Sequence, residues 1–107
     1  MSQFFETHDL LLCPSATIQP FPIEQRFVKE IDGQPCKTYI DWFAITFAIT
    51  MTSCPVISMP CGFTKEGLPI GIQVVGKPRG EVGLLQAALC LEDIFALAGN
   101  IPIDPRP

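Results

Sequence analysis

The chain has 107 residues, of which 48% are hydrophobic and 17% charged, and its formal net charge is -4. This length excludes a two-domain enzyme, the acidic balance excludes the basic surface that nucleic-acid binding requires, and the apolar content excludes a disordered chain. A small soluble domain has a large surface to cover, and this one has few charges. We therefore expect that much of its surface meets a partner, or that the chain is a piece of something larger.

The five cysteines lie at wide, irregular spacings, and no CxxC pair occurs. This pattern disfavours a zinc site or a redox pair and predicts reduced thiols in a cytoplasmic protein. The N-terminus does not resemble a signal peptide, and the longest apolar-rich stretch, 42–51, is too short to cross a bilayer. No glycine-rich phosphate loop precedes a helix. We expect no membrane segment, no metal and no cofactor.

The first predicted elements are a buried strand over 9–13 and a long irregular segment over 14–37. The strand is a short apolar run that Pro14 ends. The irregular segment holds four prolines and Gly33, and proline at this density prevents regular hydrogen-bond ladders. A loop of this length in a compact domain usually lines a site or covers a neighbouring surface.

A helix is predicted over 38–52. Thr38 can cap it, and Asp41 follows three residues later in a weaker version of the capping box. Residues 39–52 are apolar or threonine almost all round, which predicts a helix buried on every side. Such burial is easily arranged only if further chain packs over it.

Two strands joined by a long connection predict a hairpin over 55–76. The first strand includes Pro60 and follows Pro55. Because proline has no amide donor, this strand is expected to hold a bulge or to lie at the edge of the sheet.

The last predicted element is a helix over 81–98, which Gly99-Asn100 ends before an irregular tail. Apolar residues recur at helical spacing and predict one buried stripe. The stripe consists of Leu84, Ala88, Leu91, Phe95 and Ala98.

Two isolated residues, His8 and Cys61, could carry chemistry, and a non-catalytic role is preferred for both. His8 and Asp9 point to opposite faces if they are part of a strand, so they pair poorly. Cys61 has no base or cation nearby in sequence to activate it, so a packed thiol is favoured over a thiol nucleophile.

A family resemblance adds to these patterns. The segment 54–63, CPVISMPCGF, and the segment 66–76, EGLPIGIQVVG, closely resemble a C-terminal block of the amidase signature family. Leu84-Leu85 with Glu92 in the closing helix, and DLLLCP over 9–14, resemble the same family. The resemblance implies an α/β fold over 1–107, the C-terminal part of an amidase signature domain with a mixed β-sheet flanked by helices.

The resemblance covers the chain from Phe5 to about Pro102, with a few departures. Thr50 and Ser53 stand where many members have Asn and Gly, and Ser15 stands where many have Thr. A Cβ at Ser53 disfavours left-handed backbone, so we expect the turn there to use ordinary dihedral angles.

Members of this family hydrolyse amide bonds with two serines, in a Gly/Ser-rich segment, and a lysine base. This chain has no such segment and its four serines are isolated, so no catalytic residue is assigned to it. The resemblance implies substrate-pocket walls after the first strand and in the helix over 38–52. The expected wall residues are Cys13, Pro14, Ser15, Asp41, Trp42, Phe43 and Phe47. An acidic residue near position 43 serves some relatives that use glutamine; Phe43 instead suits an apolar or aromatic acyl group, unless a slip in register places Asp41 there.

The sequence thus predicts a C-terminal fragment of an amidase-type hydrolase acting on carbon-nitrogen bonds, inactive by itself. Its expected partners are the missing N-terminal amidase portion or a partner subunit, together with a small amide substrate in the whole protein. The isolated chain is expected to self-associate. Two alternatives stay open: a non-catalytic amidase-like module that binds a partner through an exposed apolar face, and a thiol enzyme built on Cys61.

Overall fold

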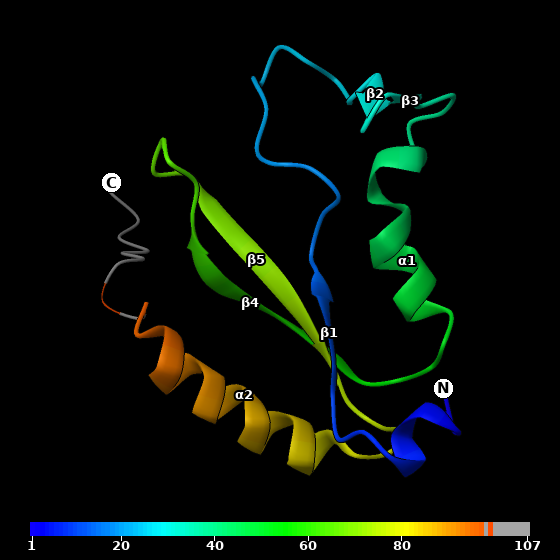
Figure 1. Ribbon diagram of the computed structural model, residues 1–107, viewed down its shortest axis with the longest axis vertical. Coiled ribbons are helices and arrows are strands. Elements are labelled where there is room, and N and C mark those ends of the chain that lie inside the picture. Colours follow the sequence, from blue (N-terminus) through cyan, green and yellow to red (C-terminus); the bar gives the residue numbers. More distant parts are fainter. Residues whose placement is uncertain (98, 100–107) are drawn as a thin grey trace, which may run out of the picture.

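The structure, a computed structural model, describes residues 1–97 and 99 as an α/β arrangement (Figure 1). The elements in chain order are η1 (Phe4–Glu6), β1 (Leu11–Pro14), β2 (Glu30–Ile31), β3 (Gln34–Pro35), η2 (Asp41–Phe43), α1 (Ala44–Thr50), β4 (Val56–Phe63), β5 (Pro69–Val75) and α2 (Glu81–Phe95). The predicted stripe residue Ala98, the Asn100 stop signal and the tail over 101–107 lie outside the described residues.

Three strands form the main sheet, in the order β1-β5-β4 and with antiparallel pairing throughout. Val75 at the end of β5 is opposite Leu11 of β1 on one side and Val56 of β4 on the other. The central strand β5 is therefore covered along both edges, and its last residues are the most deeply buried of the sheet.

The edge position and the bulge that the prolines predicted are both present on β4. The strand lies at one edge of the sheet, and its register with β5 shifts between Pro60 and Gly62. A residue without an amide donor is tolerated where the strand has no second neighbour to pair with.

The core lies where α2 packs on β4 and β5 (Figure 1). Among the described residues, its buried hydrophobic members are Cys54, Val74, Val75, Leu84 and Ala88. The stripe predicted for the last helix is buried at Leu84 and Ala88, whereas Leu91 and Phe95 are only half-buried. The helix also ends earlier than predicted, because Ala96 adopts left-handed backbone (φ 51°) and donates its N–H to the Glu92 carbonyl at 2.9 Å.

The segment over 14–37 is less irregular than predicted. β2 and β3 form a small antiparallel ribbon, with Asp32 and Gly33 at φ 48° and 75° between them. Positive φ at both central residues is the geometry of a type I′ turn, for which Asp-Gly is a preferred pair. The proline content drew the prediction away from this turn signal.

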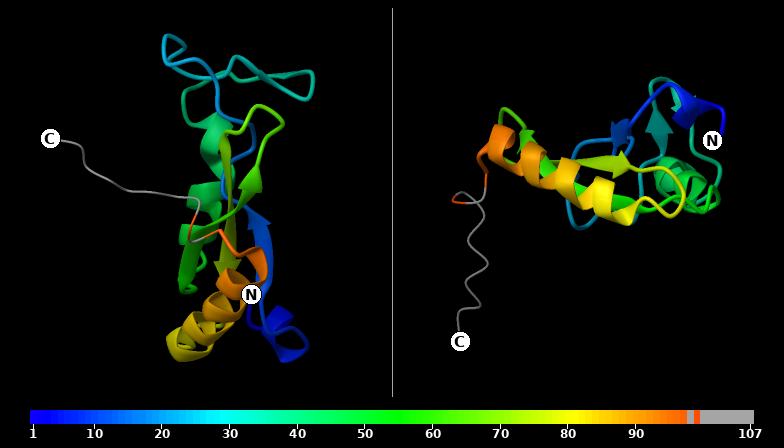
Figure 2. Two further views of the ribbon diagram at one scale, coloured as in Figure 1. Left: turned by 90° about the vertical axis from the view of Figure 1, so that its left-hand side faces the viewer. Right: turned by 90° about the horizontal axis from the view of Figure 1, so that it is seen from below.

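The prediction of one long buried helix over 38–52 is wrong in two respects. The helical part is split into η2 and α1, because Phe43 between them has φ -117° and ψ 20°. No residue of α1 is buried, and Phe47 and Met51 are 39% and 79% exposed. The helix lies beside the loop that follows β1 and is not enclosed by other elements (Figure 2). Its apolar surface is therefore left uncovered by the described part of the chain.

The turn between α1 and β4 also differs from expectation. Ser53 has φ 56°, in the left-handed region, although its Cβ was expected to exclude that conformation. Ser53 donates its N–H to the Thr50 carbonyl at 3.3 Å, and the chain then reverses toward the buried Cys54. The geometry of the exit from α1 therefore prevails over the backbone preference of serine. For a residue with a Cβ, left-handed backbone costs roughly 1–2 kcal/mol.

Replacing Ser53 by Gly is expected to stabilise the fold by about 0.5–1 kcal/mol. Gly adopts φ 56° without a Cβ clash, and its greater freedom in the unfolded chain offsets part of the gain. Urea denaturation measures the change. Ser53→Ala is the matched control because it removes the hydroxyl and keeps the Cβ. An equal gain in both variants would show that the backbone conformation is not the cause.

Candidate functional site

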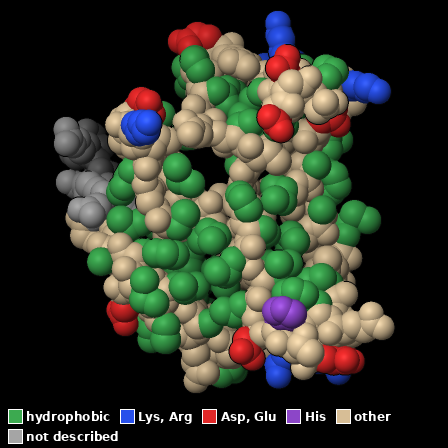
Figure 3. All heavy atoms as spheres, viewed as in Figure 1, with side chains coloured by type: hydrophobic (Ala, Val, Ile, Leu, Met, Phe, Trp, Pro, Cys, Tyr) green, Lys and Arg blue, Asp and Glu red, His purple; other side chains and the backbone are tan. Residues whose placement is uncertain are grey.

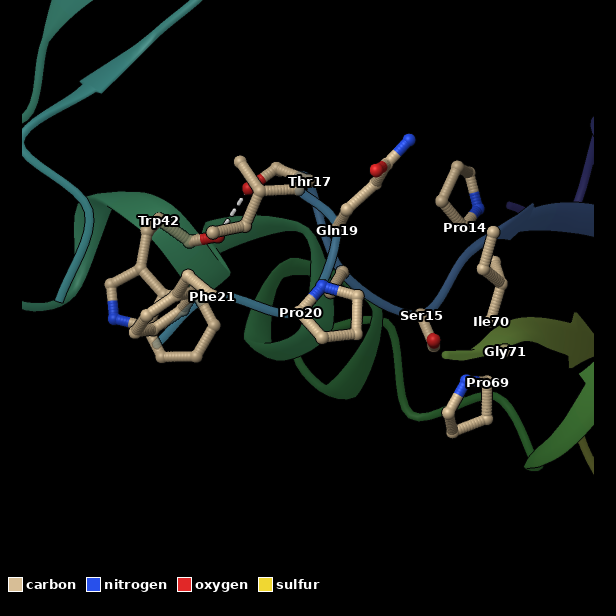
Figure 4. Close-up of a pocket in the computed structure, with 12 residues that line it drawn as sticks. Pro14, Ser15, Thr17, Gln19, Pro20, Phe21, Trp42, Pro69, Ile70 and Gly71 are labelled. Atoms are coloured by element: carbon tan, nitrogen blue, oxygen red, sulfur yellow. Dashed lines mark hydrogen bonds between the residues drawn. The ribbon is translucent and has the colours of Figure 1, made fainter. Parts of the chain in front are cut away.

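A cavity of about 610 Å³ opens between the loop after β1, the start of β5 and Trp42 (Figure 4). Its lining residues are Pro14, Ser15, Ala16, Thr17, Ile18, Gln19, Pro20, Phe21, Trp42, Pro69, Ile70 and Gly71. The molecule is visibly hollowed between the hairpin tip and this loop (Figure 3). The volume is within the range of small-molecule pockets.

Hydrogen bonds from three elements hold the loop at the mouth of the cavity. Ser15 donates its N–H to the Gly71 carbonyl of β5 at 3.2 Å and accepts at its own carbonyl from Thr46 Oγ1 of α1 at 3.0 Å. Thr17 Oγ1 donates to the Trp42 carbonyl of η2. The loop that carries seven of the twelve lining residues is thus fixed to both the sheet and the helical segment.

Close approach of the loop to β5 requires glycine at position 71. A Cβ built on Gly71 would lie 2.6 Å from Ser15 Oγ and 3.3 Å from Ser15 Cβ. The shape of the cavity at this point depends on that missing side chain.

Aromatic side chains form the wall beyond Pro20. The Phe21 and Trp42 rings meet edge-on at 5.5 Å between centroids, and Trp42 also meets Tyr39 and Phe43 edge-on. Phe47 extends this cluster through Phe43. The edge-to-face geometry is favourable for aromatic pairs, so the cluster gives the cavity a rigid apolar end.

Among the described residues, no ionisable side chain lines this cavity. Its polar side-chain groups are the hydroxyls of Ser15 and Thr17, the amide of Gln19 and the indole N–H of Trp42, which is buried without a hydrogen-bond partner among the described residues. They are set among proline, isoleucine and aromatic surface. A charged ligand group would lose its hydration here without gaining a partner of opposite charge. The lining therefore suits an uncharged, largely apolar molecule.

Of the predicted wall residues, Pro14, Ser15 and Trp42 line the cavity. Phe43 and Phe47 do not line it: Phe43 packs edge-on against Trp42, and Phe47 packs edge-on against Phe43. Prediction missed the lining from the start of β5, because no local signal shows that Pro14 lies opposite Ile72 in the sheet.

Cys13 is half-buried on β1 and does not line the cavity. The buried Gln73 donates from Nε2 to the Pro14 carbonyl at 3.1 Å and to Cys13 Sγ at 3.7 Å. Burial raises the pKa of the Cys13 thiol above its ordinary value. The neutral thiol is the form that these surroundings favour.

Asp41 forms hydrogen bonds within its own segment of the chain. Its carboxylate accepts the Lys37 N–H at 2.6 Å and the Thr38 N–H at 2.8 Å on Oδ2, and the Thr38 hydroxyl at 2.9 Å on Oδ1. The predicted capping box is not formed: Asp41 accepts the Thr38 N–H, but η2 begins at Asp41, its N-cap residue is Ile40, and no side chain caps it. The hydrogen bonds from Thr38 lower the pKa of the Asp41 carboxyl below its ordinary value.

The Lys37–Asp41 turn is therefore expected to stay closed down to unusually low pH. The lowered folded-state pKa means that the carboxylate stabilises the turn above the unfolded-state pKa of 3.8, and that this contribution is lost as pH falls through the folded-state pKa. Amide chemical shifts of Lys37 and Thr38, followed by NMR from neutral pH downward, measure the midpoint. Asp41→Asn should abolish the transition. A midpoint at or above 3.8 would contradict the hydrogen-bonding account.

His8 and Cys61, the two residues with other possible chemistry, both make contacts within the fold. The His8 ring stacks on Phe4 at 4.4 Å between centroids, and its Nδ1 lies 2.9 Å from Thr7 Oγ1. Cys61 Sγ donates to the Ile70 carbonyl at 3.6 Å.

Within residues 1–97 and 99, no three or more His, Cys, Asp or Glu side chains are grouped so that they could hold a metal ion. The helices in this part of the chain are all too short or too polar to cross a membrane.

Comparison with known proteins identifies the class to which this fold and cavity belong. The family model described as Amidase matches residues 1–85, so the chain belongs to the amidase family. It is 36% identical over 99 residues to the A subunit of the glutamyl-tRNA(Gln) amidotransferase of Alkaliphilus metalliredigens, with 92% of this chain and 19% of the relative covered. The corresponding protein of Prochlorococcus marinus is 39% identical over 98 residues, with 92% and 19% covered.

A relative with a different printed activity is also similar. The acylamidase of Rhodococcus erythropolis is 28% identical over 102 residues, with 94% of this chain and 21% of the relative covered. The chain spans about a fifth of the length of the curated relatives that it matches. The predicted family and α/β class are confirmed.

Proposed function

We propose that this chain is the C-terminal part of an amidase-type hydrolase, to which it contributes sheet core and one wall of the substrate pocket. The reaction is the addition of water to the acyl carbon of an amide, which releases an acid and ammonia or an amine. The observation that carries the proposal is the family match over residues 1–85, a range that includes every residue lining the cavity.

The reactive groups are proposed to come from outside this chain. A lysine acts as a base only when a desolvated site keeps it neutral, and Lys29, Lys37, Lys65 and Lys77 are all exposed. The serines are isolated from one another in sequence. The cavity can therefore bind and orient a substrate, while nucleophile and base belong to a complementary amidase portion.

The proposed substrate has an uncharged acyl group with apolar or aromatic character. This follows from the lining without ionisable groups and from the aromatic end formed by Phe21 and Trp42. Asp41 does not argue for a charged substrate group, because its carboxylate accepts hydrogen bonds from the Lys37 and Thr38 backbone amides.

A chimera tests this function. The chain replaces the matched 99-residue region of the Alkaliphilus relative, and ammonia release is assayed with an aromatic and a short aliphatic primary amide. Trp42→Ala is expected to lower kcat/KM for the aromatic amide about tenfold relative to the aliphatic one, because apolar pocket contacts discriminate by about this factor. The value of kcat should change less.

Ile23→Ala is the matched control, since Ile23 is 94% exposed and absent from the lining. A chimera that folds and hydrolyses neither amide would contradict the proposed function. Equal effects of the Trp42 and Ile23 substitutions would contradict the assignment of the cavity as the acyl pocket.

The exposed apolar surface favours a second candidate, a non-catalytic amidase-like module that binds a partner. Charged side chains gather at the top and bottom of the face seen in Figure 3, and hydrophobic side chains occupy much of its middle. Amide turnover by the chimera separates the two candidates, because a binding module has no need of a working pocket.

A further inference from the structure

The described part of the chain exposes more large hydrophobic side chains than it buries. Fifteen of them are exposed, whereas its buried hydrophobic residues number five. Monomeric soluble proteins rarely leave large contiguous apolar patches in contact with water.

Part of this surface is a second apolar stripe on α2, distinct from the buried stripe of Leu84 and Ala88. Val82, Leu85 and Leu89 are 73%, 60% and 61% exposed. At 3.6 residues per turn they share a sector of about 60°, centred about 110° round the helix from Leu84 and Ala88. We call these three residues the outer stripe.

The charge pattern of α2 separates the outer stripe from an ordinary solvent-facing surface. The charged residues of the helix are Glu81 at its start and Glu92 and Asp93 near its end, and the ten residues over 82–91 carry no charge. A helix whose outer face meets water normally has charged or polar residues there. The outer stripe is instead apolar and exposed.

We propose that the outer stripe is the docking surface for the remainder of an amidase polypeptide. The occupant follows from length: this chain matches only about a fifth of each relative, so most of an amidase polypeptide lies outside it. An uncharged stripe of Val and Leu requires an apolar partner surface, such as a helix or sheet of the same domain offers. The inference rests on the proposed function and names the partner surface of the same protein.

The chimera with the Alkaliphilus relative provides the test, with melting temperature as the readout. Leu85→Asp with Leu89→Asp places two carboxylates on the outer stripe, and in the chimera these would be buried against the complementary portion. We expect the Tm to fall by ~10 °C or more, or the soluble protein to be lost. The control, Ile94→Asp, introduces the same chemistry at a 73% exposed residue on another side of α2 and should change the Tm little.

A second measurement uses the separate chain. If the outer stripe is bare there, the Leu85/Leu89 variant should reduce the fluorescence of a bound hydrophobic dye at least twofold, and Ile94→Asp should have a smaller effect. An unchanged dye signal would overturn the inference. Equal Tm changes for the stripe and control variants would also overturn it, as would an insoluble wild-type chimera beside a soluble parent protein. A defined dimer of the separate chain that only the stripe variant dissociates would overturn it as well.

Failure of the proposed function gives a different result. A chimera that melts as expected, with the stripe variant destabilised and the control unaffected, but that hydrolyses no amide, supports the docking surface and overturns the hydrolase assignment.

Discussion

The separate 107-residue chain is expected to hydrolyse no simple amide, whereas the chimera should do so at a measurable rate. Amide cleavage requires a nucleophile, a base within hydrogen-bond reach and donors for the developing oxyanion. The four lysines are exposed, and the Cys61 thiol donates to the Ile70 carbonyl. Loss of a complete nucleophile and base set lowers kcat by about six powers of ten.

Ammonia release from aliphatic and aromatic amides measures this difference, with the chain assayed alone and within the chimera. Cys61→Ser is the informative variant. Turnover by the separate chain that disappears in Cys61→Ser would replace the hydrolase assignment with the thiol enzyme. Turnover that survives this change in the separate chain would also contradict the expectation of inactivity.

The largest expected loss of stability is that of Leu84→Ala. Leu84 is 5% exposed and belongs to a buried core that contains only five hydrophobic residues within the described part of the chain. It packs where β5 ends, so closely that a Cβ on Gly76 would lie 3.1 Å from Leu84 Cβ. Truncating a buried leucine costs about 2–5 kcal/mol, a large share of the roughly 5–15 kcal/mol that stabilises a typical domain.

Hydrogen exchange at the Val74 and Val75 amides measures this effect in the chimera, because both residues are fully buried on β5 beneath the helix. A loss of about 2–5 kcal/mol corresponds to exchange faster by roughly 30- to 4,000-fold. The same measurement is made on both leucine variants in the separate chain, where Leu89→Ala is the matched control. Leu89 is 61% exposed there, so its truncation should change the exchange rates little. Equal effects of Leu84→Ala and Leu89→Ala in that chain would contradict the assignment of the packing face.

Sequence patterns predicted the parts of the fold that depend on local chemistry. Pro55 and Pro60 predicted a bulge or an edge position for β4, and both are present. The regular spacing of Leu84 and Ala88 predicted the face on which α2 packs. These features follow from the missing amide donor of proline and from helical periodicity, neither of which requires knowledge of the rest of the molecule.

The parts that prediction missed depend on distant contacts or on competing preferences. The apolar pattern of α1 shows that the helix needs burial but not whether this chain supplies it. Ser53 adopts left-handed backbone because the exit from α1 requires it, against the preference of its side chain. In the cavity, Pro14, Ser15 and Trp42 are among the residues named through the family resemblance, whereas Ile70 and Gly71 join them through strand pairing across more than fifty residues.

The strand order of the main sheet bears on how copies of this chain would aggregate. Its two outer strands are β1 and β4, and each is a poor template for a further strand: β1 has four residues and ends at Pro14, and β4 is interrupted by Pro60 and its bulge. Short strands, prolines and bulges are devices that oppose edge-to-edge growth. Clustering of exposed chains would therefore proceed through side-chain faces such as α1 and the outer stripe, and would give amorphous, detergent-soluble assemblies rather than fibrils.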